Sequence, residues 1–197
     1  MATSRRASGS KRSRDVTVYT VGHSTRSLDE FLAMLKAHGV RAVADVRRYP
    51  RSRRFPHFND DALAAELPGR GLAYLPFPAL GGRRRAARDS RNTGWRSESF
   101  RGYADYMLTP AFQDALEELI KAGRAAPTAI MCAEAVPWRC HRSLIADALL
   151  ARGVKVLDVM NERNAPPHEM TPFANVRGTR VTYPALQPGL WEQPAPG

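Results

Sequence analysis

Cysteine is scarce in this sequence, and long apolar runs are absent. The chain of 197 residues has two cysteines, Cys132 and Cys140. Two are too few for a disulfide framework, which favours a reducing cytoplasm. No apolar run approaches the roughly 18–20 residues that a transmembrane helix needs, and the first residues lack the apolar core of a secretory signal. We therefore expect a cytoplasmic protein with no membrane partner.

Several catalytic signatures are also missing. The sequence has no glycine-lysine phosphate loop and no HExxH motif, and the stretch GHSTR lacks the second glycine of a nucleophile elbow. A tyrosine-phosphatase loop is excluded because Trp138 stands where its arginine would follow Cys132. No cofactor can be identified, and we expect none.

Acidic residues are outnumbered. The chain has 30 Lys and Arg against 19 Asp and Glu, a net charge of +11. Residues 1–15 carry +4 of this charge, and we predict that they form a disordered basic arm. The remaining +7 favours contact with polyanions or phosphorylated small molecules. The alternative, that the arginines serve only solubility, stays open.

Apolar runs alternate with helical patterns through the middle of the chain. The alternation predicts a single α/β domain over 16–160, with a mostly parallel, doubly wound sheet flanked by helices. Strands are expected at 16–21, 41–46, 72–77, 127–133 and 154–159. Helices are expected after the N-caps Ser27, Asn59 and Thr109, near 100–107, and at 141–151.

Connections and ends complete the prediction. The first two strands and their helix read as a βαβ unit, which implies a parallel pair. Residues 80–97 form a long connection with six arginines, and such loops are functional or disordered. The proline-rich residues 161–197 are expected to wrap or trail the domain, with one edge strand near 180–183.

Reactive residues follow three of the predicted strands. Ligands of open α/β sheets bind outside the carboxyl ends of the strands. His23 follows the first strand, Asp45 and Arg47 end the second, and the stretch MCAEAVPWRCHRS at 131–143 begins at the end of the fourth. We therefore expect these groups to share one pocket at one edge of the sheet.

The stretch 131–143 offers two kinds of chemistry. Cys140 and Arg142 fall in the first turn of a helix, where unpaired amides and the helix dipole favour anions. A thiol there tends toward thiolate, the better nucleophile. The same amides with Arg142 can equally hold a phosphate or a carboxylate. Cys132 lies within an apolar strand and is expected to be an inert core residue. The spacing of the cysteines and His141 matches no common zinc site, so we expect no metal.

The order of these motifs resembles a known family. The stretches YTVGHSTRSLDEFLAMLKAHGV, VADVRRYPRSRRFPHFN, LGGRR, GYADYM and MCAEAVPWRCHRSLIADALLARGV resemble the bacterial and archaeal domain-of-unknown-function family 488. The resemblance runs from about Val18 to Val159 and implies a compact α/β fold, without a settled reaction, substrate or cofactor. The residues at the family's motif positions are His23, Asp45, Arg47, Pro50, Ser52, Gly81, Gly82, Tyr103, Cys132, Glu134, Cys140, His141 and Arg142.

Three functions remain open at this point. The first is an enzyme acting on an anionic substrate, a nucleotide or a nucleic-acid fragment. Its candidate catalytic residues are Cys140, His141, Glu134, His23 and Asp45, and its candidate substrate-binding residues are Arg47, Arg142, Ser52, Arg54 and Tyr103. The second is a non-catalytic nucleic-acid-binding module that stacks bases on Phe55, His57, Phe58 and Trp95. The third is a thiol-based redox or sulfur-handling protein. No oligomeric state is predicted.

Overall fold

The protein was analysed as a computed structural model that describes residues 16–185. The predicted basic arm at 1–15 and the end of the predicted C-terminal extension, 186–197, lie outside the described residues.

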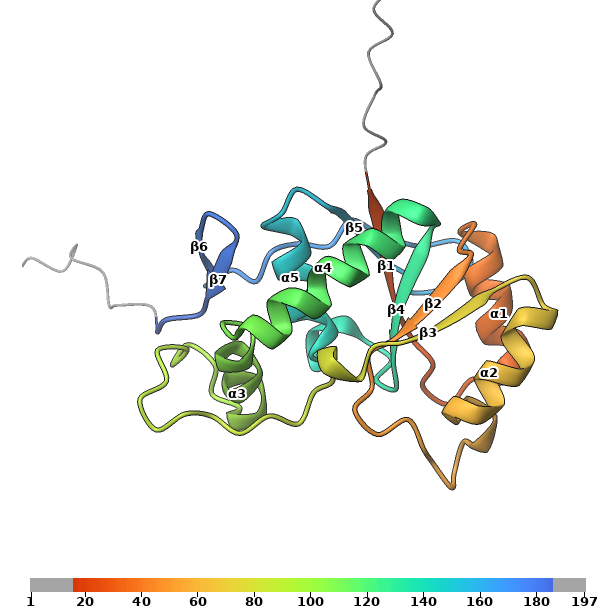
Figure 1. Cartoon of the computed structure of the whole chain (residues 1–197), viewed down its shortest axis with the longest axis horizontal. Helices are drawn as coiled ribbons and strands as arrows, with labels where there is room; N and C mark the ends of the chain where they lie inside the picture. Colours follow the sequence, from red (N-terminus) through yellow and green to blue (C-terminus); the bar gives the residue numbers. More distant parts are fainter. Residues whose placement is uncertain (1–15, 186–197) are drawn as a thin grey trace, which may run out of the picture.

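The centre of the fold is a five-stranded sheet in which every pairing is parallel (Figure 1). Its order is β3-β2-β4-β1-β5. The strands are β1 (Thr17–Gly22), β2 (Ala42–Asp45), β3 (Ala73–Pro76), β4 (Thr128–Cys132) and β5 (Lys155–Asp158). The predicted α/β class with a parallel sheet is confirmed.

One detail of the predicted topology is wrong. The strands β1 and β2 run parallel but are not neighbours, because β4 lies between them and pairs with both. All five residues of β4 are buried, as expected for an apolar strand covered on both faces. This apolar run takes the central position and separates the two strands of the βαβ unit.

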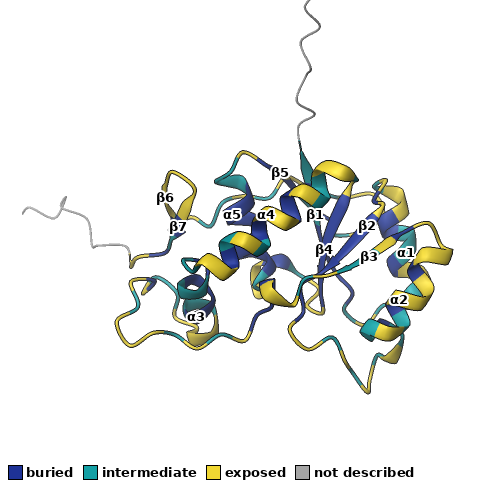
Figure 2. Ribbon diagram, in the orientation of Figure 1, coloured by how far each residue is buried: buried dark blue, intermediate teal, exposed yellow. Residues whose placement is uncertain are grey.

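Helices cover both faces of the sheet. The helices are α1 (Leu28–Ala37), α2 (Asp60–Gly69), α3 (Glu98–Tyr106), α4 (Pro110–Ala125) and α5 (Arg142–Leu150). Figure 1 shows α1 and α2 on one side of the sheet, with α4 and α5 on the other. The side chains of β4 alternate between these layers: Ala129 and Met131 join the core under α1 and α2, whereas Ile130 and Cys132 join the core under α4 and α5. Figure 2 shows the central strands buried between the two layers.

Local capping explains where helices begin. Ser27 and Glu30 form the predicted capping box at α1. Thr109 caps α4 by accepting a hydrogen bond from the backbone N–H of Phe112. Asn59 is the N-cap of α2 by position but makes no side-chain cap. Its side-chain oxygen accepts instead from the N–H of Ser52, 2.7 Å away, and so fixes the loop after β2.

The described part of the C-terminal segment lies against the domain. Backbone hydrogen bonds join Pro166 and His168 to the outer edge of β5. The predicted strand near residue 180 exists as β7 (Arg180–Thr182), but it pairs antiparallel with β6 (Asn175–Arg177) in a separate hairpin rather than at an edge of the main sheet. Residues 161–185 therefore wrap over β5 and α5.

A buried histidine fastens this segment to the domain. His168 bonds Asp158 through Nδ1 at 2.8 Å and Asp147 through Nε2 at 3.2 Å. Tyr183 donates its hydroxyl hydrogen to Asp147 at 2.8 Å. The two carboxylates raise the pKa of His168 to about 9, against the lowering effect of burial. At neutral pH the imidazolium is therefore the counter-ion of two buried carboxylates.

None of the helices within residues 16–185 combines the length and the apolarity that a bilayer crossing requires.

Candidate functional site

The loop after β4 folds back over the end of β1. In the sheet Gly22 pairs with Cys132. The next residues cross so closely that a Cβ on Gly22 would lie 1.8 Å from the carbonyl oxygen of Glu134. Glycine is therefore required at position 22, because any side chain would push the loop away. This crossing turns the chain toward the start of α5.

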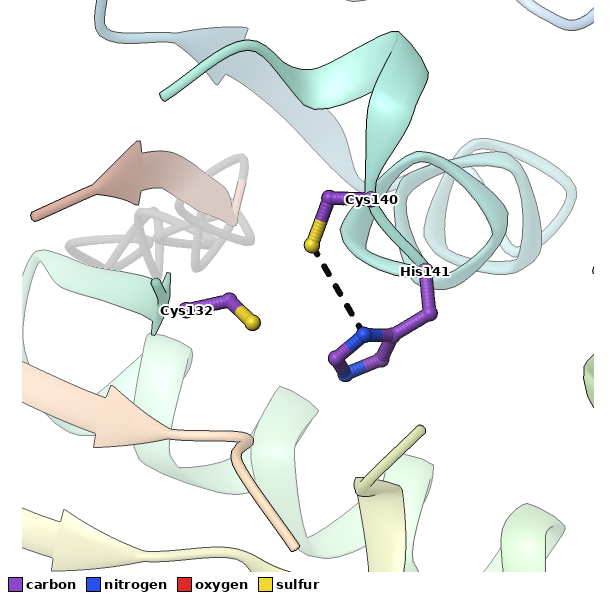
Figure 3. A group of neighbouring side chains, drawn as sticks. All are labelled: Cys132, Cys140 and His141. Atoms are coloured by element: carbon purple, nitrogen blue, oxygen red, sulfur yellow. Dashed lines mark hydrogen bonds between the residues drawn. The ribbon is translucent and has the colours of Figure 1, made fainter. Parts of the chain in front are cut away.

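Two thiols and an imidazole meet where β4 ends and α5 begins (Figure 3). Sγ of Cys140 lies 3.6 Å from Nδ1 of His141. With Sγ of Cys132 they form a set of atoms within 4.8 Å of one another, here called the thiol cluster (Cys132, Cys140 and His141). Both cysteines are free thiols and are buried, at 8% and 3% exposure. The cluster is thus a shielded dithiol with one imidazole beside it.

The imidazole of His141 is held in one tautomer. Its Nε2 lies 3.0 Å from the carbonyl oxygen of Val46. A carbonyl can only accept, so Nε2 carries a hydrogen, which leaves Nδ1 to take the Cys140 proton and then to donate a hydrogen bond back to the thiolate. The ring packs between Gly82, where a Cβ would come within 2.9 Å of Nδ1, and Tyr103, whose ring centroid is 5.0 Å away. His141 is therefore oriented as a base for the Cys140 thiol.

The two cysteines titrate in opposite directions. The pKa of Cys140 is held well below its usual value by a hydrogen bond from the Cys132 thiol, and then by the hydrogen bond and charge of His141 and the charge of Arg142, which together outweigh burial. The pKa of Cys132 is raised well above its usual value by that same bond to Cys140, by burial and by the charge on Cys140. One thiolate therefore forms in the cluster, on Cys140.

Arg142 supplies a buried positive charge beside the cluster. Its side chain is 1% exposed. It donates to the carbonyl of Glu134 at 2.6 Å and to the hydroxyl of Thr20 at 3.3 Å. Within residues 16–185 no carboxylate lies within salt-bridge distance of it, and its Nε has no hydrogen-bond partner. A buried guanidinium favours a negative charge nearby, and the charge of Arg142 is one of the causes that lower the pKa of Cys140.

A second group of polar residues lies on the other face of the sheet. Arg47 makes a bidentate ion pair with Asp45, and Oδ2 of this carboxylate also accepts the hydroxyl hydrogen of Tyr74. His23 stacks on Phe58 at 4.1 Å and approaches Arg47 at 3.4 Å. Burial, and then the charge of Arg47, lower the pKa of His23 to about 4. We call His23, Asp45, Arg47 and Tyr74 the ion-pair cluster.

The predicted site residues are thus divided between two clusters. Cys140, His141, Arg142 and Tyr103 come together on the α4–α5 face, and Tyr103 donates its hydroxyl hydrogen to the carbonyl of Leu80. His23, Asp45 and Arg47 belong to the ion-pair cluster, beside a cavity of about 410 Å³ lined by Asp45, Arg47, Pro50, Asp60, Asp61, Ala64, Tyr74, Pro76 and Pro78.

Three predicted residues belong to neither cluster. Glu134 is exposed and contributes its backbone carbonyl, not its carboxylate, to the bonds described above. The hydroxyl of Ser52 accepts from the N–H groups of Arg54 and Phe55 and so shapes the loop. Arg54 is exposed, with its guanidinium 5.3 Å from the ring centroid of Phe55.

The aromatic residues predicted as stacking surfaces are largely enclosed. Phe58 is fully buried, and Phe55 and His57 are half-buried against it. Trp95 packs on Phe100, at 4.7 Å between ring centroids. These rings pack the loops against the domain and leave little free surface on which a base could stack.

The sequence-based choice of catalytic residues left out Cys132, although the thiol-based alternative relies on both cysteines. Cys132 was predicted to be an inert core residue because it ends an apolar strand, and it is buried as that prediction requires. The signal that identifies it is its position as the last residue of the central strand. A side chain there faces a helix layer and also lies at the carboxyl edge where ligands bind.

The thiol cluster also has ligand chemistry. Two thiolates and an imidazole nitrogen suit Zn²⁺, and an outer hydrogen bond like that of His141 to Val46 is common among metal-bound histidines. The cluster supplies three ligands, and within residues 16–185 no fourth His, Cys, Asp or Glu joins them.

Comparison with known proteins places the chain in a family. Neither the curated proteins nor the solved structures gave a match. A family model does match, over residues 27–149, from the capping box of α1 to the end of α5. The match includes the whole thiol cluster with Arg142 and Tyr103, and it leaves out β1 with His23. The chain belongs to the family described as Domain of unknown function DUF488.

Proposed function

We propose that the chain is a thiol-dependent enzyme that uses Cys140 as its nucleophile on an anionic substrate. The observation that carries this proposal is the contact of Cys140 Sγ with Nδ1 of an imidazole whose other nitrogen is fixed by a backbone carbonyl. A nucleophile, a base and a group that orients the base form the usual arrangement for nucleophilic catalysis.

Each residue has a distinct part in the proposed reaction. Cys140 attacks an electrophilic centre as the thiolate, and His141 holds the proton that the thiol gives up and returns it to the leaving group. The neighbouring Cys132 thiol, whose sulfur lies within 4.8 Å of that of Cys140, holds the pKa of Cys140 down. Arg142 balances the thiolate charge and is a positioning residue, because both of its terminal nitrogens already donate to the protein. Exposed arginines at the carboxyl edge attract the substrate by charge.

The thiolate can be titrated directly. Absorbance near 240 nm, which reports thiolate, is expected to rise in two steps, one well below and one above the ~8.5 of an ordinary thiol. Cys140→Ser removes the lower step, because that step is the ionisation of the Cys140 thiol. Cys132→Ala keeps one step and moves it upward, because the donated hydrogen bond is lost. A wild-type protein whose two thiols both titrate near 8.5 would contradict the proposal.

A second candidate function is thiol redox chemistry, favoured by the proximity of the two free sulfurs. A peroxide would oxidise the Cys140 thiolate to a sulfenic acid, with the second peroxide oxygen leaving as water after protonation. The Cys132 sulfur would then displace the sulfenic oxygen as a second water and form a disulfide.

Mass spectrometry of the intact chain tests this candidate. One equivalent of hydrogen peroxide is expected to remove two hydrogens, a mass loss of about 2 Da, and a reductant restores the mass. Cys132→Ser is expected to gain one oxygen instead, because its sulfenic acid finds no second thiol. A stable sulfenic acid in the wild-type chain would count against the redox function without affecting the nucleophile.

A further inference from the structure

Two exposed aromatic residues flank the thiol cluster, and each stands beside an arginine. Tyr49 is 61% exposed and Trp138 is 65% exposed, whereas the other large aromatic side chains of the described region are at least half-buried. Tyr49 follows Arg48 in the loop after β2, and Trp138 precedes Arg139 two residues before Cys140. Neither ring is needed for the core, so both are available to a ligand.

The loop after β3 connects Tyr49 to the thiol cluster. Gly82 packs directly on the ring of His141, and Arg83 follows it. Arg48 donates to the carbonyl oxygen of Arg83 at 3.1 Å. The guanidinium carbons of Arg48 and Arg83 lie 5.6 and 5.7 Å from the centroid of the Tyr49 ring. A series of contacts therefore runs from His141 to an aromatic ring with two guanidinium groups close to it.

Arg83 adopts an unusual backbone conformation at this place. Its φ is 58°, in the left-handed region that residues other than glycine seldom enter. Residues in such strained conformations gather at ligand-binding sites. The strained backbone turns its carbonyl to Arg48 and keeps both guanidiniums beside one ring.

The surrounding loops have almost no negative charge. The loop between β2 and α2 has five arginines at 47–54 and no acidic residue before Asp60. The loop 80–97 adds six arginines against Asp89 alone. This edge of the sheet therefore attracts polyanions over a distance of roughly a Debye length, about 8–10 Å.

We infer that Arg48, Tyr49, Arg83, Trp138 and Arg139 form a surface for single-stranded nucleic acid beside the thiol cluster. Bases stack on the two rings, and phosphates contact the arginines. The bases of a duplex are already stacked on one another, and an acidic peptide offers charge without a π-face, so single strands suit both parts of the surface. The inference deepens the proposed function by naming its substrate class, and rests on it only in assigning the reaction to Cys140.

Fluorescence anisotropy tests the inference with a labelled single-stranded oligonucleotide of about 12 nucleotides. Tyr49→Ala and Trp138→Ala are each expected to weaken binding by about tenfold, because each removes one stacked base. The double variant Arg48→Gln, Arg83→Gln is expected to reduce the slope of log K against log salt by about 1.4, because two phosphate contacts are lost. The double variant Arg177→Gln, Arg180→Gln is the matched control, since it removes two exposed arginines from the β6–β7 hairpin.

Cys140→Ser separates this inference from the proposed function. It removes the nucleophile and is expected to bind the oligonucleotide as the wild-type chain does, so binding can succeed where chemistry fails. Three results would overturn the inference. The first is an equal loss of affinity in the Arg177, Arg180 control and in the Arg48, Arg83 double variant, and the second is wild-type affinity in both aromatic variants. Competition by polyglutamate as strong as that by the oligonucleotide would overturn it too, since charge alone would then explain binding.

Discussion

Replacing Gly22 with alanine is expected to lower the free energy of unfolding by about 3 kcal/mol or more. The new Cβ would have to occupy a position 1.8 Å from the carbonyl oxygen of Glu134, so the loop after β4 must move away. That loop supplies the carbonyl that binds the buried Arg142. Urea unfolding measures the loss, and the 240 nm titration is expected to show the low thiolate step moving toward that of an ordinary thiol.

Gly69→Ala is the matched control. A Cβ at position 69 meets nothing within 4 Å, and its φ is not positive. It stands in the last turn of α2, where alanine is the better helix former, so the change is expected to leave stability within about 1 kcal/mol of wild type. If Gly22→Ala were as stable as Gly69→Ala, the close crossing of the loop over β1 would be wrong.

His168→Gln is expected to cost about 3 kcal/mol of stability at pH 7. The change leaves Asp147 and Asp158 buried without their shared cation, and breaking a buried ion pair by removing one partner costs this much. Thermal or urea unfolding gives the size of the loss. Limited proteolysis within residues 161–185 is expected to become faster, because His168 fastens that segment to β5 and α5.

The pH dependence of this difference has a definite sign. The folded pKa of His168 is about 9 against an ordinary value of 6.5. Protonated histidine therefore stabilises the folded state fully below pH 6.5, and its contribution, at most about 3 kcal/mol, is lost as the pH rises through 9. The difference in the free energy of unfolding between the wild-type chain and His168→Gln is expected to fall as the pH rises from 6.5 to 9. A difference that stays constant from pH 6 to pH 9.5 would show that the imidazole is neutral in the fold.

The fold class followed from local patterns, but the strand order did not. Alternating apolar runs and capped helices such as that at Ser27 specify which segments form strands and helices. No local sequence pattern shows that β4 lies between β1 and β2. The strand order depends on tertiary packing, which buries a strand that is apolar on both faces at the centre of the sheet. Asn59 is the predicted N-cap of α2, but its side chain does not cap the helix, because its amide oxygen accepts instead from the N–H of Ser52, seven positions earlier.

The candidate site was predicted at the correct edge of the sheet, but as one pocket instead of two clusters. Neighbouring residues of a strand point to opposite faces. Asp45 and Cys132 both end strands, yet Asp45 bonds Tyr74 and Arg47 on one face while Cys132 packs under α5 on the other. Sequence shows which residues reach an edge. The face of the sheet on which each side chain lies depends on the register of the strands, and that register arises from packing.

Because the partner that orients His141 is the main-chain oxygen of Val46, no substitution at position 46 can remove it. The N–H of Val46 is itself bonded to Met131 in the central strand, so the acceptor is anchored to the sheet. A side-chain acceptor can be lost through a single codon change, whereas this one persists for as long as the sheet does. The orientation of the His141 ring is thus set by the fold itself rather than by the choice of a neighbouring side chain.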